Sequence, residues 1–239
     1  MSTERGGERA DDRFQRILVV CTRQLGDVLL TTPLIRASRE RWPAATIDVL
    51  GFGGTLGMLR GNTDIAELIE VPAGSGWLAS RALIRRLWRR YDLALIAQYS
   101  DRAHLYGFAA AKRRAGQVTD ELKSWWKRAL LEHCVPMNDT QSHSVVQKLR
   151  LLDPWVEPHG AALVAPAASE LPTEFAALLV PPYVVLQTPT AVAYKQWPIE
   201  HWRLLVDALL ARGLQVVLTG APSAATPRSP TSPRRATCR

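Results

Sequence analysis

Cysteine is scarce in this 239-residue sequence, and the three that occur, Cys21, Cys134 and Cys238, are widely spaced. Their number excludes a disulfide framework, and their spacing matches no zinc or redox motif. The five histidines include no pair at metal-ligand spacing on one helix, so we predict no metal site and no cofactor. We expect each histidine to be exposed or hydrogen-bonded.

Long apolar runs are also missing. Residues 1–13 contain no segment that resembles a signal peptide, and no later run reaches the roughly 18 apolar residues of a membrane span. With so few cysteines, these absences predict a soluble chain in the reducing cytoplasm.

Acidic residues are fewer than basic ones, which gives a formal net charge of +8. Residues 221–239 carry four arginines and no acid, so half of the excess lies in this tail and nucleic-acid binding is not indicated. The other basic residues cluster in mid-chain, where they form either solvated helix faces or a surface that attracts an anionic partner. These clusters are Arg81, Arg85, Arg86, Arg89 and Arg90; Lys112, Arg113 and Arg114; and Lys123, Lys127 and Arg128.

Residues 17–21 are aliphatic or cysteine without polar alternation, as in a strand that is buried on both faces of a parallel sheet. A short polar turn with Arg23, Gly26 and Asp27 follows, and residues 28–41 have helical spacing. In open α/β sheets, ligands and catalytic groups gather at the turn after such a strand. This turn is therefore the first candidate site.

Strands and helices continue to alternate along the chain, which predicts the α/β class with a mostly parallel sheet. We expect strands at 46–52, 66–71, 92–97 and 114–118, and helices at 77–90, 102–111 and 142–152. The glycine-rich turn at 51–57 follows the second strand and lacks the G-x-G-x-x-G spacing. It therefore does not indicate a nicotinamide-dependent oxidoreductase.

A change of composition after residue 155 predicts a domain boundary. The expected organisation is an N-terminal α/β domain at 14–155, a proline-rich linker at 156–181, a second α/β domain at 182–220 and a tail at 221–239. The second domain would hold strands at 183–186 and 214–218 around a helix at 199–212. The tail has no leucine, isoleucine, valine or aromatic residue, so we predict that it is disordered. Two strands and one helix make an incomplete domain, which suggests a C-terminally truncated product.

Two motifs resemble those of a known family. Residues 16–34, RILVVCTRQLGDVLLTTPL, look like the N-terminal signature of the glycosyltransferase family 9 heptosyltransferases of lipopolysaccharide synthesis. Residues 195–202, KQWPIEHW, are similar to the Lys-x-Trp-Pro segment that opens the second domain of that family. The motifs occur in the family's order, and the resemblance extends to Gly220.

The resemblance implies the GT-B fold, with an acceptor-side N-terminal domain and a C-terminal nucleotide-sugar domain, each Rossmann-like. It implies inverting transfer of heptose from ADP-heptose to the lipid A-linked inner core, without metal, at the cytoplasmic face of the inner membrane. Asp27 would be the general base. Lys195 with Thr188 or Thr190 would bind the donor phosphates, and Arg23 and Gly26 would lie on the acceptor side.

Simpler roles stay open for each residue. Asp27 could cap the following helix, Arg23 could pair with a neighbouring acid, and Lys195 could be an ordinary exposed lysine. Gly26 would allow close backbone approach at the turn in either case. The family's later Asp-Ser-Gly-Pro-x-His segment, which helps to hold the sugar nucleotide, is absent. The sequence therefore predicts impaired transfer, with a non-catalytic module that binds anionic glycans as the alternative.

Overall fold

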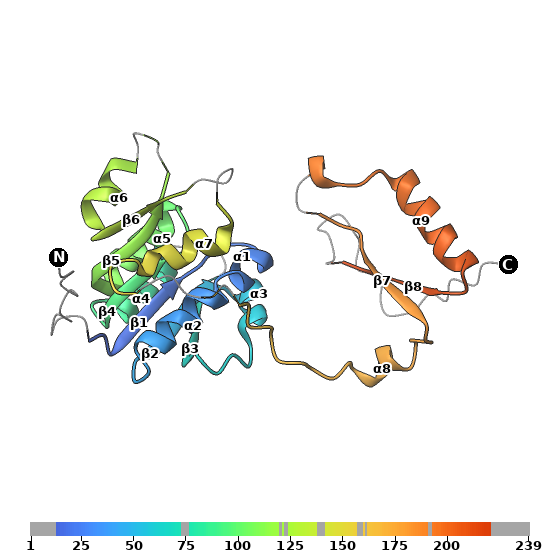
Figure 1. Cartoon of the computed structure of the whole chain (residues 1–239), viewed down its shortest axis with the longest axis horizontal. Helices are drawn as coiled ribbons and strands as arrows, with labels where there is room; N and C mark the ends of the chain where they lie inside the picture. Colours follow the sequence, from blue (N-terminus) through green and yellow to red (C-terminus); the bar gives the residue numbers. More distant parts are fainter. Residues whose placement is uncertain are drawn as a thin grey trace, which may run out of the picture. The chain divides into compact units, whose positions relative to one another are not determined.

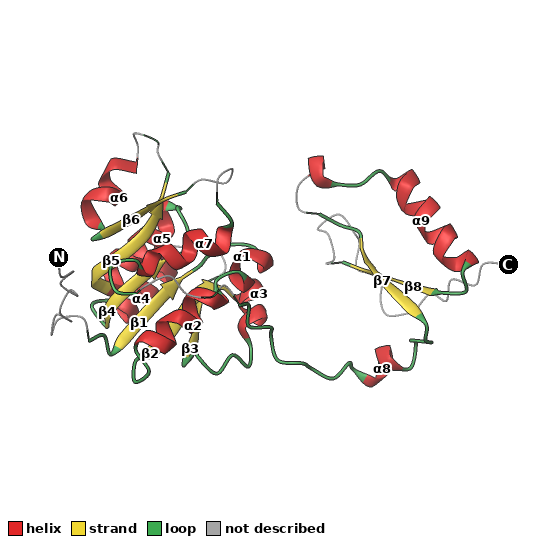
Figure 2. Ribbon diagram, viewed as in Figure 1, coloured by secondary structure: helices red, strands yellow, loops and turns green. Residues whose placement is uncertain are grey.

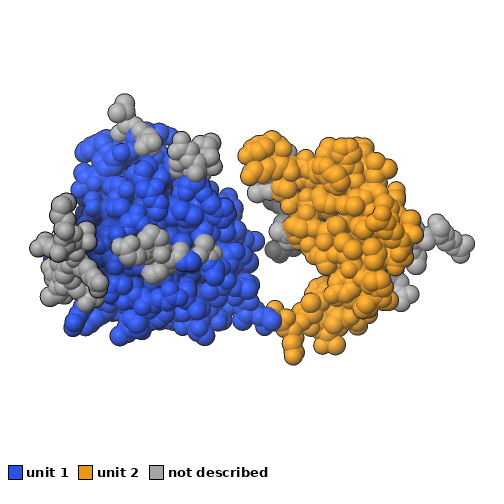
Figure 3. All heavy atoms as spheres, in the orientation of Figure 1, with its two compact units in different colours: residues 1–168 blue, residues 169–239 orange. Residues whose placement is uncertain are grey.

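The structure is a computed structural model that describes residues 13–72, 77–119, 121, 124–137, 142–156, 160, 162–190 and 193–220. It divides into two compact units, residues 1–168 and 169–239 (Figure 3). The predicted tail at 221–239 lies outside the described residues, as do Lys123 and His159. The finer domain limits given above remain a prediction.

Unit 1 is built on a six-stranded sheet in which neighbouring strands pair in parallel (Figure 1). The strand order is β3-β2-β1-β4-β5-β6. In chain order the strands are β1 (Arg16–Val20), β2 (Thr46–Phe52), β3 (Glu67–Val71), β4 (Tyr91–Ile96), β5 (Ala111–Val118) and β6 (His133–Pro136). The prediction of an α/β chain with a parallel sheet is confirmed.

Helices cover both faces of this sheet (Figure 2). On one face, α2 (Thr32–Arg41) packs beside α7 (Ser144–Leu149) and η4 (Arg150–Leu152). On the other face lie α4 (Trp77–Leu87) and α5 (Asp101–Ala110). The shorter helices of unit 1 are α1 (Leu25–Leu29), α3 (Gly53–Leu56), η2 (Gly57–Leu59) and α6 (Trp125–Leu130).

The central strand β1 supplies side chains to both cores. Ile17 and Val19 belong to the core under α2, and Leu18 and Val20 belong to the core under α4 and α5. All four are fully buried, which confirms the strand predicted from their unbroken apolar run. The candidate turn therefore follows a strand that is buried on both faces.

An aromatic cluster joins the start of unit 1 to residues that follow η4. Phe14, Trp42 and Trp155 pack edge to face, with ring centroids 5.0–6.3 Å apart. The Arg113 guanidinium lies 5.1 Å from the Phe14 ring centroid and 5.6 Å from that of Trp155. Such pairs stabilise beyond their buried area.

The single helix expected at 28–41 is two helices, α1 and α2. Pro33 lies in the first turn of α2. It has no N–H to continue the hydrogen-bond ladder of α1, so the chain restarts as a second helix. The sequence pattern gave the correct helical region but missed this break.

Helix α6 and strand β6 were not predicted from the sequence. Strand β6 has four residues and lies at the edge of the sheet, where it ends on Pro136. An edge strand tolerates proline and needs no long apolar run. Helix α6 is too short for a helical period to stand out.

Unit 2 contains α8 (Thr173–Ala176), β7 (Tyr183–Gln187), η5 (Ala193–Lys195), α9 (Ile199–Ala211) and β8 (Gln215–Thr219). Strands β7 and β8 form a two-stranded parallel sheet. Both strands and the intervening helix were predicted within one residue of these bounds.

Candidate functional site

The predicted turn lies where the strand order of the sheet reverses. Strand β1 has β2 on one side and β4 on the other, so the chain winds away from it in both directions. In open α/β sheets, ligands bind in the crevice at the carboxyl ends of the two strands that flank this switch point. Here those ends lead into residues 21–31 after β1, which include the short helix α1, and into residues 97–100 after β4. We call these two segments the loops of the switch point.

Arg23 and Asp27 form an ion pair at this position. Arg23 Nε donates to Asp27 Oδ2 over 2.9 Å, and the two side chains keep 33% and 29% of their surface exposed. The Arg23 guanidinium also lies 5.3 Å from the centroid of the Tyr99 ring. The first turn therefore presents a half-exposed carboxylate whose direction is fixed by an arginine.

Asp27 is not a helix cap. The N-cap of α1 is Gln24, which makes no side-chain capping bond, and Asp27 is the third residue of the helix. The N-cap of α2 is Thr31. The capping alternative is thus wrong, and the alternative that Arg23 pairs with a neighbouring acid is confirmed.

Gln98 ties the two loops of the switch point together. Its Oε1 accepts from the Thr22 N–H over 2.8 Å, and its Nε2 donates to the hydroxyls of Thr22 and Ser100, each over 2.6 Å. Gln98 is buried, so these bonds are shielded from water. This role was not predicted from the sequence, because a single glutamine after a buried strand gives no signal.

Gly26 has open space where a side chain would project. A Cβ atom built there meets nothing within 4 Å, and its φ is not in the left-handed region. Neither internal packing nor backbone strain therefore requires glycine at this position.

Lys148 contacts the backbone of this turn from the buried side, and its role was not predicted from the sequence. Its buried ammonium donates to the Asp27 carbonyl oxygen and to Thr31 Oγ1, the latter over 3.0 Å. Burial lowers the pKa of Lys148, and the nearby Cys21 and Asp27 oppose this shift. A signal did exist, because Lys148 lies three residues after Val145 and four before Leu152, on the apolar stripe of a helical pattern.

The donor-side residues predicted from the second motif lie in unit 2. Gln196 joins two of their segments, because its Oε1 accepts from the Thr190 N–H over 3.3 Å and its Nε2 donates to the Thr188 carbonyl over 3.1 Å. Lys195 is exposed, with Nζ 5.7 Å from the centroid of the Tyr194 ring. Unit 2 thus holds Thr188, Thr190 and Lys195 in one local region.

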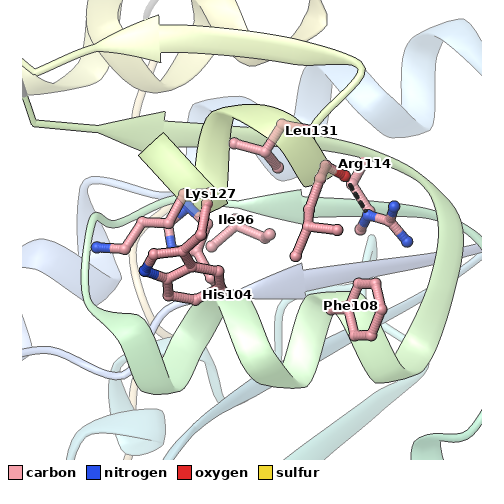
Figure 4. A pocket seen from close by; sticks show the side chains of 8 residues that line it. Ile96, His104, Phe108, Arg114, Lys127 and Leu131 are labelled. Atoms are coloured by element: carbon pink, nitrogen blue, oxygen red, sulfur yellow. Dashed lines mark hydrogen bonds between the residues drawn. The ribbon is translucent and has the colours of Figure 1, made fainter. Parts of the chain in front are cut away.

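One sequence expectation fails beside α6. Lys127 was assigned to a basic cluster of helix faces, yet it is buried. His104 is buried as well but is hydrogen-bonded, as expected: its Nδ1 lies 2.9 Å from the Ser100 carbonyl oxygen, whereas its Nε2 has no hydrogen-bond partner. Burial, with Lys127 nearby, lowers the pKa of His104. Both side chains line one side of a small pocket, with Phe108 and Arg114 on the other (Figure 4).

The described residues contain no cluster of three or more His, Cys, Asp or Glu side chains suited to a metal ion. No helix in the described ranges has the length and apolarity to cross a bilayer.

Comparison with known proteins identifies relatives over most of the chain. Lipopolysaccharide heptosyltransferase 3 of Escherichia coli K12 is 30% identical over 214 residues, which are 83% of this chain and 61% of that protein. The present chain therefore spans less than two thirds of the length of this relative.

Two solved structures share the fold. The structure of a family 9 glycosyl transferase from Veillonella parvula matches with a TM-score of 0.70 at 19% identity, covering 87% of this chain and 63% of that one. E. coli heptosyltransferase WaaC with ADP-2-deoxy-2-fluoro heptose matches with a TM-score of 0.65 at 22% identity, covering 87% and 70%. These matches confirm the predicted GT-B class.

The sequence model of glycosyltransferase family 9 (heptosyltransferase) matches residues 80–232. This range is more than half of the chain and includes Lys195 but not Asp27. On this match, the chain belongs to glycosyltransferase family 9.

Proposed function

We propose that the chain takes part in heptosyl transfer from ADP-heptose to a lipid A-linked core oligosaccharide, with inversion at the anomeric carbon. The observation that carries this is the half-exposed Asp27 carboxylate at the switch point of a family 9 fold. An inverting transfer needs one carboxylate to take the proton of the acceptor hydroxyl as that hydroxyl attacks. Asp27 is our candidate for this base.

Arg23 and Gly26 serve the acceptor side in this proposal. The bond from Arg23 Nε fixes the direction of the Asp27 carboxylate and leaves the rest of the guanidinium to meet anionic groups of the acceptor. The open space above Gly26 lets an acceptor hydroxyl approach the backbone next to the base.

Lys195, with Thr188 or Thr190, serves the donor side. The leaving group is a nucleoside diphosphate, whose developing negative charge needs cationic or N–H partners. Lys195 is exposed, and the neighbouring Gln196 bonds Thr188 and Thr190 in the turn that follows β7. We propose that this turn contacts the diphosphate.

The first experiment compares Asp27→Asn with the unchanged chain in a transfer assay with ADP-heptose and the lipid A-linked core acceptor. We expect the rate to fall by about 10²–10⁴-fold, because the amide cannot take the proton. The free energy of unfolding should change by less than about 1 kcal/mol, because the pair with Arg23 is partly exposed.

Asp153→Asn is the matched control. Asp153 pairs with Arg150 Nε at short helical spacing, over 3.6 Å, but Arg150 begins η4 and Asp153 directly follows it. Transfer by Asp153→Asn should equal that of the unchanged chain. Retained transfer by Asp27→Asn would remove Asp27 as the base.

A second candidate function is a non-catalytic module that binds anionic glycans. The observation that favours it is the row of exposed arginines along and after α4, namely Arg81, Arg85, Arg86, Arg89 and Arg90. Trp88, in the same row, is 56% exposed. We propose that this row contacts the cytoplasmic face of the inner membrane, where the acceptor lies.

Titration calorimetry separates the two functions. Binding of both ADP-heptose and the acceptor, with turnover, supports the transferase. Acceptor binding without donor binding supports the module. Lys195→Ala should weaken donor binding only, and an unchanged donor affinity would count against its assigned role.

A further inference from the structure

Two of the buried polar side chains of unit 1 are lysines, and each ammonium contacts a loop of the switch point. Lys148 of α7 is 3% exposed and Lys127 of α6 is 5% exposed. Lysine is rarely buried to this degree, because removing its charge from water is costly unless that charge is well bonded. The partners of these two ammonium groups are therefore informative.

Lys148 bonds the loop after β1. Its Nζ donates to the carbonyl oxygen of Asp27 and to Thr31 Oγ1, and Thr31 Oγ1 in turn lies 2.8 Å from the same carbonyl oxygen. The carbonyl is the backbone of the residue whose carboxylate faces Arg23. Lys148 thus fixes the backbone of Asp27 from the buried side and leaves the Asp27 side chain partly exposed.

Lys127 bonds the loop after β4. Its Nζ donates to the Tyr99 carbonyl oxygen over 2.6 Å and pairs with Asp101 Oδ1 over 2.6 Å. The Tyr99 ring is the one that the Arg23 guanidinium faces. Figure 4 shows Lys127 next to His104, within the pocket between α5 and α6.

The two contacts are of the same kind. Lys127 comes from α6, which follows β5, and reaches a carbonyl oxygen in the loop after β4. Lys148 comes from α7, which follows β6, and reaches a carbonyl oxygen in the loop after β1. Salt bridges at the surface are screened and weak, but a buried ammonium that bonds a carbonyl is directional and shielded.

We propose that Lys148 and Lys127 are positioning residues that hold the two loops of the switch point, and thereby align the Asp27 carboxylate with Arg23. The catalytic consequence rests on the proposed function. The positioning itself does not, and it can be measured without turnover.

The test is amide hydrogen exchange, followed by NMR on the whole chain, for Lys148→Met and Lys127→Met. In Lys148→Met, the amides of Val28, Leu30 and Thr31, which close the turns of α1, should exchange about tenfold faster or more. In Lys127→Met, the amide of His104, which bonds the Ser100 carbonyl, should be the one that speeds up. Each variant should leave the amide exchange rates of the other loop unchanged.

Lys112→Met is the control, because Lys112 is an exposed lysine on β5. Lys112→Met should change the amide exchange rates of neither loop. If both buried-lysine variants speed exchange equally at both loops, the lysines contribute only to global stability and the proposal is wrong. If neither buried-lysine variant changes amide exchange in either loop, the proposal is also wrong.

Lys148→Gln guards against a Met variant that does not fold. Its carboxamide keeps an N–H donor for the Asp27 carbonyl, so exchange in α1 should lie between that of the unchanged chain and that of Lys148→Met. Exchange in Lys148→Gln as fast as in the Met variant would refute the role of this bond.

Two further readouts separate positioning from folding. The Arg23 Nε–H resonance reports the bond to Asp27, and it should broaden or shift in Lys148→Met but not in Lys112→Met. In the transfer assay, Lys148→Met should lower kcat about tenfold or more at unchanged acceptor KM. If the unchanged chain shows no transfer, the proposed function fails, and the exchange pattern still decides whether the lysines hold the loops.

Discussion

Replacing Gln98 by leucine tests the connection between the two loops of the switch point. The change keeps a similar volume but removes one acceptor and two donors from a buried position. It leaves the Thr22 N–H without its bond, although the Thr22 and Ser100 hydroxyls can rotate to other partners. The substitution therefore isolates the hydrogen bonds of one side chain.

The expected loss follows from these bonds. A typical buried hydrogen bond contributes about 1 kcal/mol net, and a buried donor left unpaired costs about 1–3 kcal/mol. The loss of the contact to the Thr22 N–H and of the two hydroxyl contacts should together lower the free energy of unfolding by about 3–5 kcal/mol. In urea unfolding followed by tryptophan fluorescence, the midpoint should fall while the m-value stays constant.

Gln24→Leu is the matched control for this experiment. Gln24 lies in the loop after β1 as well, but it is exposed and makes no capping bond. Its replacement should change stability by less than about 0.5 kcal/mol. A loss of less than about 1 kcal/mol for Gln98→Leu would show that Gln98 does not hold the loops together.

Four other predictions concern packing and pH. Gly26→Ala should keep or raise stability by up to about 1 kcal/mol, because its Cβ meets open space in a helix, yet it should slow transfer if the acceptor approaches there. Gly107→Ala should destabilise by about 1–3 kcal/mol in the same urea assay, because its Cβ would lie 2.6 Å from Ile96 Cδ1. Trp155→Ala should cost about 3–5 kcal/mol by calorimetry through loss of the aromatic cluster, and a loss below about 1 kcal/mol would refute that packing. Burial lowers the pKa of His104, so as the pH falls its imidazole is protonated at a higher pH in the unfolded state than in the folded state. The free energy of unfolding should therefore fall by up to about 1.4 kcal/mol per pH unit below about pH 6.5. His104→Phe should reduce that slope between pH 7.5 and 5, and an unchanged slope would contradict the assignment.

The sequence by itself determined the α/β class, the strands other than the short edge strand β6, and the place of the first candidate turn. Unbroken apolar runs such as residues 17–20 can only be buried on both faces, so they report the parallel sheet directly. The two motifs gave the family, because their residues are specific in type and order.

Only the tertiary structure decided which polar residues support the site. Lys148 and Gln98 act through partners that are 121 and 76 residues away in the sequence, and Lys127 reaches the Tyr99 carbonyl across 28 residues. Local composition made Lys127 look like part of a solvated basic face, but the sheet order brings α6 against the loop after β4. A charged side chain can be buried only where bonding partners lie beside it, and a local pattern such as the apolar stripe through Lys148 does not identify those distant partners.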